Sequence, residues 1–142
     1  MEAIEILLIE DNEGDIVLTL EALQEARIKN KVSVIKDGDA AIKYLEKVKE
    51  GEGTVPDLIL LDINLPKIDG KEVLTYIKND GHLKKIPVVM LTTSSSENDI
   101  SDAYSNHANC YITKPVDINK FFDIIKAIED FWIMIAKLAS KD

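Results

Sequence analysis

Leu58-Ile59-Leu60-Leu61 is an unbroken apolar run, and the acidic residue Asp62 follows it directly. An apolar run of this length is typical of a strand buried on both faces, as in a parallel β-sheet. Similar short runs recur on either side of it, and they alternate with longer segments of helical periodicity. This alternation predicts strand-helix-strand units in which helices cover both faces of a parallel sheet. The predicted fold class is therefore α/β.

Five pairs of one strand and one helix can be placed on the sequence. The predicted strands are residues 4–9, 32–35, 58–61, 88–91 and 110–112, and the predicted helices are residues 14–26, 39–49, 70–79, 97–105 and 117–138. The chain has 142 residues, which is close to the commonest size of one domain. We therefore expect a single domain over residues 1–142.

The charge and composition argue against several classes of function. The formal net charge is −9, whereas binding to nucleic acid or to an anionic membrane requires a basic surface. Residues 1–5 lack the basic start of a signal peptide, and no apolar stretch is as long as a membrane span. Cys110 is the only cysteine, so no disulfide within the chain is expected. We predict a cytoplasmic protein that binds neither nucleic acid nor a membrane.

Reactive polar residues follow four of the five predicted strands. Glu10 and Asp11 come after the first strand, Asp62 after the third, Thr92 after the fourth and Lys114 just beyond the fifth. Open parallel sheets bind their ligands outside the carboxyl ends of the strands. We therefore expect these side chains to form one site. For Asp11 the plainer interpretation also stands, because an acidic residue after a strand often caps the next helix.

Three carboxylates gathered at one edge of a sheet would repel each other. At separations of about 5 Å and an effective dielectric near 20, each pair costs roughly 3 kcal/mol, so the cluster must take up protons or bind a cation. Hard oxygen ligands with no histidine or thiolate nearby in the sequence favour Mg²⁺. Asp62 is the predicted nucleophile because a rigid strand presents it, while Lys114 can neutralise phosphoryl oxygens and Thr92 can donate a hydrogen bond. These roles predict phosphoryl transfer.

The site residues belong to a pattern that covers essentially the whole chain. Its parts are Glu10-Asp11, residues 61–66 with Asp69-Gly70, Leu91-Thr92, and Tyr111 to Lys114-Pro115. This pattern resembles the receiver domains of two-component systems. The resemblance implies a doubly wound, flavodoxin-like sheet of five parallel strands in the order 2-1-3-4-5, with helices on both faces.

The resemblance also implies how the acidic residues act. Asp62 would accept a phosphoryl group from the phosphohistidine of a sensor histidine kinase. Asp11, Asp62 and the main-chain carbonyl of Asn64 would hold Mg²⁺, and Glu10 would act through a bound water. The chain would then be a phosphoacceptor signalling module with slow self-catalysed phosphotransfer and autodephosphorylation, and not an enzyme with a released product.

The remaining site residues are implied to read out the phosphorylation. Lys114 would bind a phosphoryl oxygen. Thr92 and Tyr111 would form a switch pair, in which the threonine moves toward the phosphoryl group and the aromatic ring turns inward. Such a change shifts a two-state equilibrium and reshapes a protein-binding face. We therefore expect the output to be protein contact within a phosphorelay.

Two further features concern partners. Residues 65–70, 92–96 and 107–111, with the tail as far as 131–132, are similar to stand-alone regulators that pair with phytochrome-type kinases, which implies a kinase partner of that type. Residues 131–136 place apolar side chains nearly all round the predicted last helix. A helix usually turns one stripe toward the core, and one stripe cannot bury all of these side chains. An exposed apolar remainder favours a homodimer through this helix. The alternative is a longer helix that simply covers more of the core.

Three other functions stay open on the sequence alone. A magnesium-dependent phosphatase would also use an aspartate nucleophile, but such enzymes place it after the first strand, with a second aspartate two residues on, where this chain has Asn64. In a flavin-binding protein of similar topology, residues 10–13 would repel the flavin phosphate. The third function is an interaction scaffold that is never phosphorylated. Such a scaffold would not need the full set of residues for phosphoryl transfer that this chain carries.

Overall fold

The computed structural model describes residues 3–25, 29–92, 100–101, 105, 110–113, 123, 126–127 and 130. Strands and helices alternate along this part of the chain, which confirms the predicted fold class. Their order is β1 (Ile4–Ile9), α1 (Glu13–Gln24), β2 (Asn30–Ile35), α2 (Gly38–Lys49), β3 (Leu58–Leu61), α3 (Gly70–Lys78), the 3₁₀ helix η1 (Leu83–Lys85), β4 (Val88–Thr92) and β5 (Cys110–Thr113).

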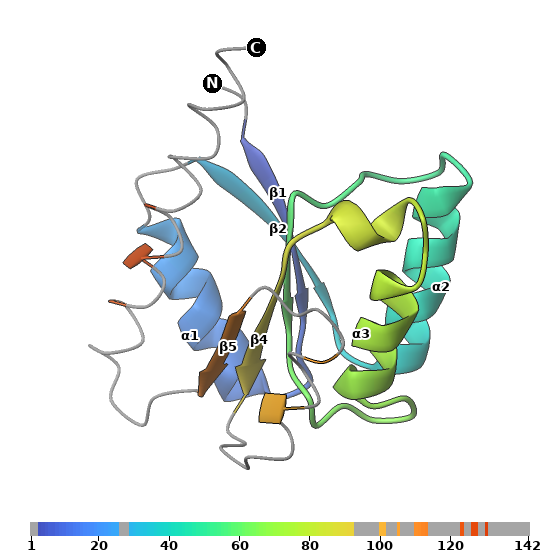
Figure 1. The fold of residues 1–142 in the computed structure, drawn as a ribbon. Coiled ribbons are helices and arrows are strands. Elements are labelled where there is room, and N and C mark those ends of the chain that lie inside the picture. The colour runs from blue at the N-terminus through green and yellow to red at the C-terminus, as the bar shows by residue number, and fades with distance from the viewer. Residues whose placement is uncertain are drawn as a thin grey trace.

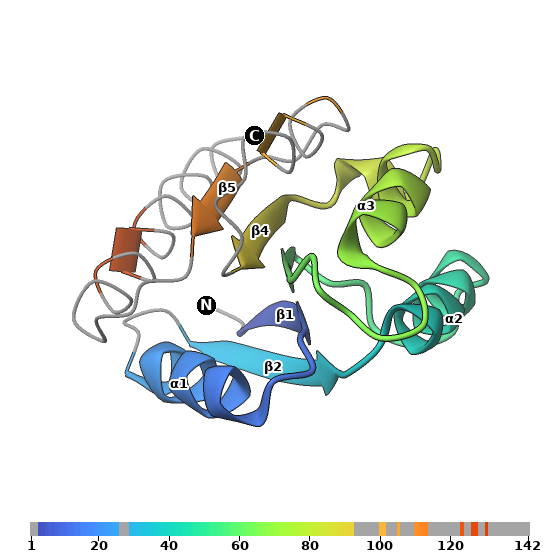
Figure 2. The same ribbon diagram turned by 90° about the horizontal axis from the view of Figure 1, so that it is seen from below.

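The five strands form one parallel sheet in the order β2-β1-β3-β4-β5, as expected. β3 lies at its centre and pairs with β1 on one side and β4 on the other. All strands point the same way, so their carboxyl ends share one edge of the sheet (Figure 1). Figure 2 views the molecule from below Figure 1, with α1 on one face of the sheet and α2 and α3 on the other.

The two faces of the sheet carry separate hydrophobic cores. Along β1, Leu7 and Ile9 belong to the core that includes α2 and α3, while Ile6 and Leu8 belong to the core that includes α1. This alternation follows from the two-residue period of a strand. Because both faces are covered, the central strand β3 is apolar and buried at every position, which is why the run 58–61 indicates a parallel sheet.

Side chains at the helix starts fix where three helices begin. Asn12 caps α1, Asp37 caps α2 and Asp69 caps α3, each by accepting a hydrogen bond from a main-chain N–H three residues on. The predicted bounds of these helices differ from the observed ones by one or two residues. For example, α1 ends at Gln24, two residues before its predicted end. No helix in the described part of the chain is long and apolar enough to cross a membrane.

One element was not predicted, and two predicted helices are described only in part. Asp80 starts η1 by accepting hydrogen bonds from Leu83 N at 2.9 Å and His82 N at 2.8 Å, and these bonds, chiefly the one from Leu83, lower its pKa. Of the predicted helices 97–105 and 117–138, residues 100–101, 105, 123, 126–127 and 130 are helical. The rest of both helices, including the apolar segment 131–136, lies outside the described residues.

Candidate functional site

Glu10 and Asp62 lie at the carboxyl ends of the two neighbouring strands β1 and β3. The main chain places them there, because Ile9 pairs with Leu61 and the Asp62 N–H donates to the Ile9 carbonyl at 3.1 Å. Both side chains are buried, with 2% of Glu10 and 7% of Asp62 exposed. Each carboxylate therefore extends from the end of a rigid strand, and the main chain to which it is attached can move little.

Asp11 completes an acidic cluster with Glu10 and Asp62. One carboxylate oxygen from each of the three residues lies within 4.8 Å of the others, and Asp11 is exposed. At this distance and an effective dielectric near 20, two full negative charges repel by about 3.5 kcal/mol. The structure thus brings together the three carboxylates that the sequence places after β1 and β3, with one side of the cluster open to solvent.

Main-chain N–H groups orient the two buried carboxylates. Asn12 N donates to Glu10 Oε2, and Asn64 N donates to Asp62 Oδ1, both at 3.3 Å. In each case the donor lies two residues after the acceptor, in the turn that leaves the strand. These long bonds hold the carboxylates in place but offset only part of the repulsion within the cluster.

The donor set of the acidic cluster fits a divalent metal ion. It consists of carboxylate oxygens, and the cluster includes no histidine or cysteine among the residues the structure describes. Hard oxygen ligands of this kind suit Mg²⁺ or Mn²⁺, whereas zinc sites are built mainly from nitrogen and sulfur. The exposed Asp11 keeps the cluster open to water, which a bound Mg²⁺ usually retains as additional ligands.

The other predicted site residues are described in part. Thr92 ends β4, beside β3, and its main chain pairs with Thr113 of β5, while Tyr111 pairs with Met90. Thr92 thus ends at the same edge of the sheet as Asp62. The side chains of Thr92 and Tyr111, and the whole of Lys114, lie outside what the structure describes.

Sequence reasoning missed two glycines that pack against the loop after Asp62. A Cβ atom at Gly70 would lie 1.9 Å from the Asp62 carbonyl oxygen, and one at Gly38 would lie 1.8 Å from the Ile68 carbonyl oxygen. Gly70 belongs to the motif, but the motif gives it no physical role, and the sequence patterns point to no role for Gly38. The only signal in the sequence is that each follows an aspartate, in Asp37-Gly38 and Asp69-Gly70.

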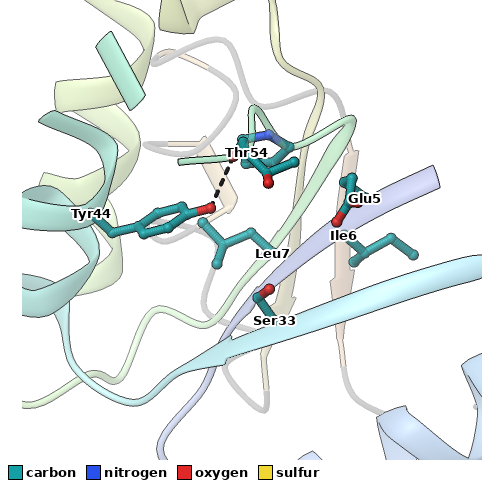
Figure 3. Close-up of a pocket in the computed structure, with 7 residues that line it drawn as sticks. Glu5, Ile6, Leu7, Ser33, Tyr44 and Thr54 are labelled. Atoms are coloured by element: carbon teal, nitrogen blue, oxygen red, sulfur yellow. Dashed lines mark hydrogen bonds between the residues drawn. The ribbon is translucent and has the colours of Figure 1, made fainter. Parts of the chain in front are cut away.

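A small pocket lies away from the acidic cluster, near the amino ends of β1 and β3 (Figure 3). Glu5, Leu7, Ser33, Tyr44 and Thr54 contribute to its lining, and it has room for about one water molecule. Tyr44 Oη donates to the Thr54 carbonyl at 2.9 Å, and burial, with a smaller effect of Glu5, raises the pKa of Tyr44. This pocket is too small for a ligand, so the acidic cluster is the better candidate site.

Removing one buried charge from the acidic cluster is expected to stabilise the metal-free protein. Glu10→Gln keeps the side-chain shape and an oxygen that can accept from Asn12 N, but it removes the repulsion. We expect a gain of about 1–2 kcal/mol in the free energy of unfolding in EDTA. Urea unfolding of the variant and the wild type, in EDTA and in excess Mg²⁺, measures this change in the free energy of unfolding.

The exposed Glu50→Gln is the matched control for this charge effect. The gain should shrink or reverse in Mg²⁺, because the metal offsets the same repulsion in the wild type. A Glu10→Gln variant that is less stable than the wild type in EDTA would contradict the electrostatic account.

Comparison with known proteins gives a consistent result. The sequence profile of the response regulator receiver domain matches residues 6–126. The chain is 45% identical over 129 residues to the response regulator Rcp1 of Synechocystis sp., covering 90% of this chain and 88% of that protein.

Solved structures of two such regulators are also similar to this fold. The phosphorylated cyanobacterial phytochrome response regulator RcpA superposes with a TM-score of 0.85 and 47% identity, covering 93% of this chain and 95% of that one. The Mn²⁺-bound form of Rcp1 gives a TM-score of 0.82 and 44% identity, covering 90% of this chain and 93% of that one.

Proposed function

Because the chain belongs to the response regulator receiver family of two-component systems, we propose that it accepts a phosphoryl group on Asp62 from a sensor histidine kinase. The observation that carries this proposal is the position of Asp62. It is a buried carboxylate at the end of the central strand, within 4.8 Å of two further carboxylates that can share a metal ion. The receiver is a signalling module, and its product is its own phosphorylated state.

In this proposal the metal is Mg²⁺, and the acidic cluster holds it. Asp11, Asp62 and the main-chain carbonyl of Asn64 would hold it directly, and Glu10 would act through a water. The bound cation would offset the negative charge that accumulates when a phosphoryl group approaches the carboxylates. Two observations support the metal, namely the oxygen donor set described above and the Mn²⁺-bound structure of the relative Rcp1.

The chain itself supplies position and charge for the transfer. An Asp62 carboxylate oxygen forms a bond to phosphorus as the phosphorus–nitrogen bond of the kinase phosphohistidine breaks, and the imidazole nitrogen keeps the electron pair and gains a proton from solvent. Lys114 binds the phosphoryl oxygens and offsets their charge. The same groups then favour slow attack by water on phosphorus, which breaks the bond to the Asp62 oxygen, releases inorganic phosphate and returns Asp62 to its free form.

The output is a change of shape that partner proteins detect. Thr92, at the carboxyl end of β4, and Tyr111, within β5, act as the switch pair. The similarity to RcpA and Rcp1 supports a kinase of the phytochrome type. We further propose that residues 1–142 act as one cytoplasmic domain and that the chain forms a homodimer through its last helix. In this proposal it signals through protein contacts in a phosphorelay and does not bind DNA.

The proposal is tested by intact mass after incubation with acetyl phosphate, in Mg²⁺ and in EDTA. We expect one phosphoryl adduct per chain in Mg²⁺ and at least about tenfold less in EDTA, because the metal screens the acceptor. Size-exclusion chromatography of the same samples tests whether the dimer depends on phosphorylation. Steady release of inorganic phosphate without an adduct would indicate a phosphatase, and a folded protein with neither result would indicate a scaffold.

A further inference from the structure

The loop after Asp62, residues 62–69, is held at two points by the first residues of α2 and α3. We call it the acceptor loop, because it begins at the proposed phosphoacceptor and contains Asn64, the proposed carbonyl ligand. The main-chain N–H of Gly70 donates to the Ile63 carbonyl at 2.8 Å, and that of Gly38 donates to the Pro66 carbonyl at 3.3 Å. α3 continues directly from this loop, whereas α2 lies elsewhere in the sequence and supplies no site residue.

Gly38 contacts the acceptor loop more closely than any side chain would permit. A Cβ atom there would lie 1.8 Å from the carbonyl oxygen of Ile68, 2.7 Å from its carbonyl carbon and 2.9 Å from its Cβ atom. The first two of these atoms are main chain, so a side-chain rotation cannot relieve the contact. The acceptor loop and α2 therefore fit together only because position 38 has no Cβ atom.

The start of α2 is itself fixed in place. Asp37 Oδ1 accepts a hydrogen bond from Ala40 N at 2.7 Å, which caps the helix. Farther along the helix, Ala41 and Leu45 are fully buried in the core that α2 shares with α3 and the sheet. The acceptor loop thus packs against a helix end that is fixed in place, and this contact restricts the conformation of the loop.

The backbone of the acceptor loop is strained at this contact. Lys67 has a φ of 69°, in the left-handed region that a residue with a side chain adopts at a cost of about 1 kcal/mol. It lies between Pro66 and Ile68, the two residues that contact Gly38. Ile68 N donates to the Pro66 carbonyl at 2.9 Å, which closes a tight turn around Lys67. The start of α2 contacts the residues on both sides of Lys67 and so packs against this turn.

We infer that Gly38 is a positioning residue for the proposed phosphoryl-accepting site, although it touches neither the metal nor the phosphoryl group. The close contact between α2 and Ile68 holds the acceptor loop in the shape that aims the Asn64 carbonyl and the Asp62 carboxylate at the same ion. This inference rests on the proposed function. It adds that Gly38, a residue outside the acidic cluster, helps to set the affinity for the metal.

Gly38→Ala tests the inference, with Gly81→Ala as the matched control. A Cβ atom at Gly81 meets nothing within 4 Å, so that substitution changes composition equally without touching the loop. We expect Gly38→Ala to weaken Mg²⁺ binding, measured by calorimetry in the absence of any phosphodonor, by about tenfold, the lower range for loss of a group that supports a metal ligand. Gly81→Ala should bind Mg²⁺ with wild-type affinity.

Urea unfolding keeps the test valid where Gly38→Ala is less stable. In excess Mg²⁺ the bound metal stabilises the folded state, and a tenfold weaker affinity reduces that gain by about 1.4 kcal/mol, whatever the stability in EDTA. As a milder second variant, Asp37→Ala inserts no atom at the contact. It removes the cap of α2 and the 3.9 Å ion pair between Asp37 and Lys67 of the acceptor loop, and we expect a loss of about threefold in affinity. Asp39→Ala, in the same helical turn, is its control.

The outcomes separate this inference from the proposed function. If the wild type neither binds Mg²⁺ nor accepts a phosphoryl group, the proposed function fails. If the wild type does both and Gly38→Ala binds Mg²⁺ as tightly as Gly81→Ala, the function stands and the positioning role is overturned. A Gly38→Ala variant that loses stability equally in EDTA and in Mg²⁺ would also overturn it, because Gly38 would then support the fold alone.

Discussion

Asp62→Asn is expected to abolish phosphoryl acceptance, with at least a hundredfold less adduct than the wild type after equal exposure to acetyl phosphate and Mg²⁺. The amide nearly preserves the shape of the side chain, so the end of β3 and the bond from Asn64 N can be retained. It removes the carboxylate that acts as nucleophile and one charge of the acidic cluster. Intact mass spectrometry measures the adduct, and peptide mapping places it.

The control for Asp62→Asn is an aspartate at the other end of the same strand. Asp57 precedes β3 and accepts a hydrogen bond from Glu5 N at 2.8 Å, a bond that an asparagine oxygen can also accept. Asp57→Asn should therefore take up the phosphoryl group at the wild-type rate. An undiminished adduct in Asp62→Asn would place the acceptor elsewhere and would remove the central step of the proposed function.

The fold could be predicted from the sequence because each central strand is buried on both faces. The run 58–61 is apolar at every position, and the run 4–9 is apolar except at Glu5. The structure gives β1 and β3 these same bounds. β2 lies at the edge of the sheet and is less buried, so its polar start at Asn30 and Lys31 carries no apolar signal, and the predicted strand begins only at residue 32. Burial thus sets which strand bounds the sequence alone can predict.

The juxtaposition of Glu10, Asp11 and Asp62 could also be predicted, because parallel strands bring their carboxyl ends to one edge. The contact between Gly38 and Ile68 could not, since it depends on how closely α2 packs beside the acceptor loop. No local pattern encodes that distance. The same applies to Lys67, whose positive φ belongs to the tight turn that Ile68 N closes on the Pro66 carbonyl and does not follow from a preference of lysine.

Gly70→Ala is expected to be, with Gly38→Ala, one of the two most damaging glycine substitutions in the described part of the chain. A Cβ atom at position 70 would lie 1.9 Å from the Asp62 carbonyl oxygen and 2.8 Å from both the Asp62 carbonyl carbon and Ile63 Cα, all of them main-chain atoms. Relief of this overlap requires the main chain at the phosphoacceptor to shift. We expect a loss of about 3 kcal/mol in the free energy of unfolding, which corresponds to a fall of about 10 °C in the melting temperature.

This substitution should also reduce phosphoryl acceptance more than Gly38→Ala does, because the displaced carbonyl belongs to Asp62 itself. Thermal unfolding and the acetyl phosphate assay, run below the variant's own transition, measure the two effects separately. Gly81→Ala again serves as control, since its added methyl group meets nothing. A stable Gly70→Ala variant with wild-type phosphoryl acceptance would mean that the start of α3 can move away from β3 without cost. In that case the rigid base assigned to Asp62 would have to come from β3 and its pairing with β1 alone.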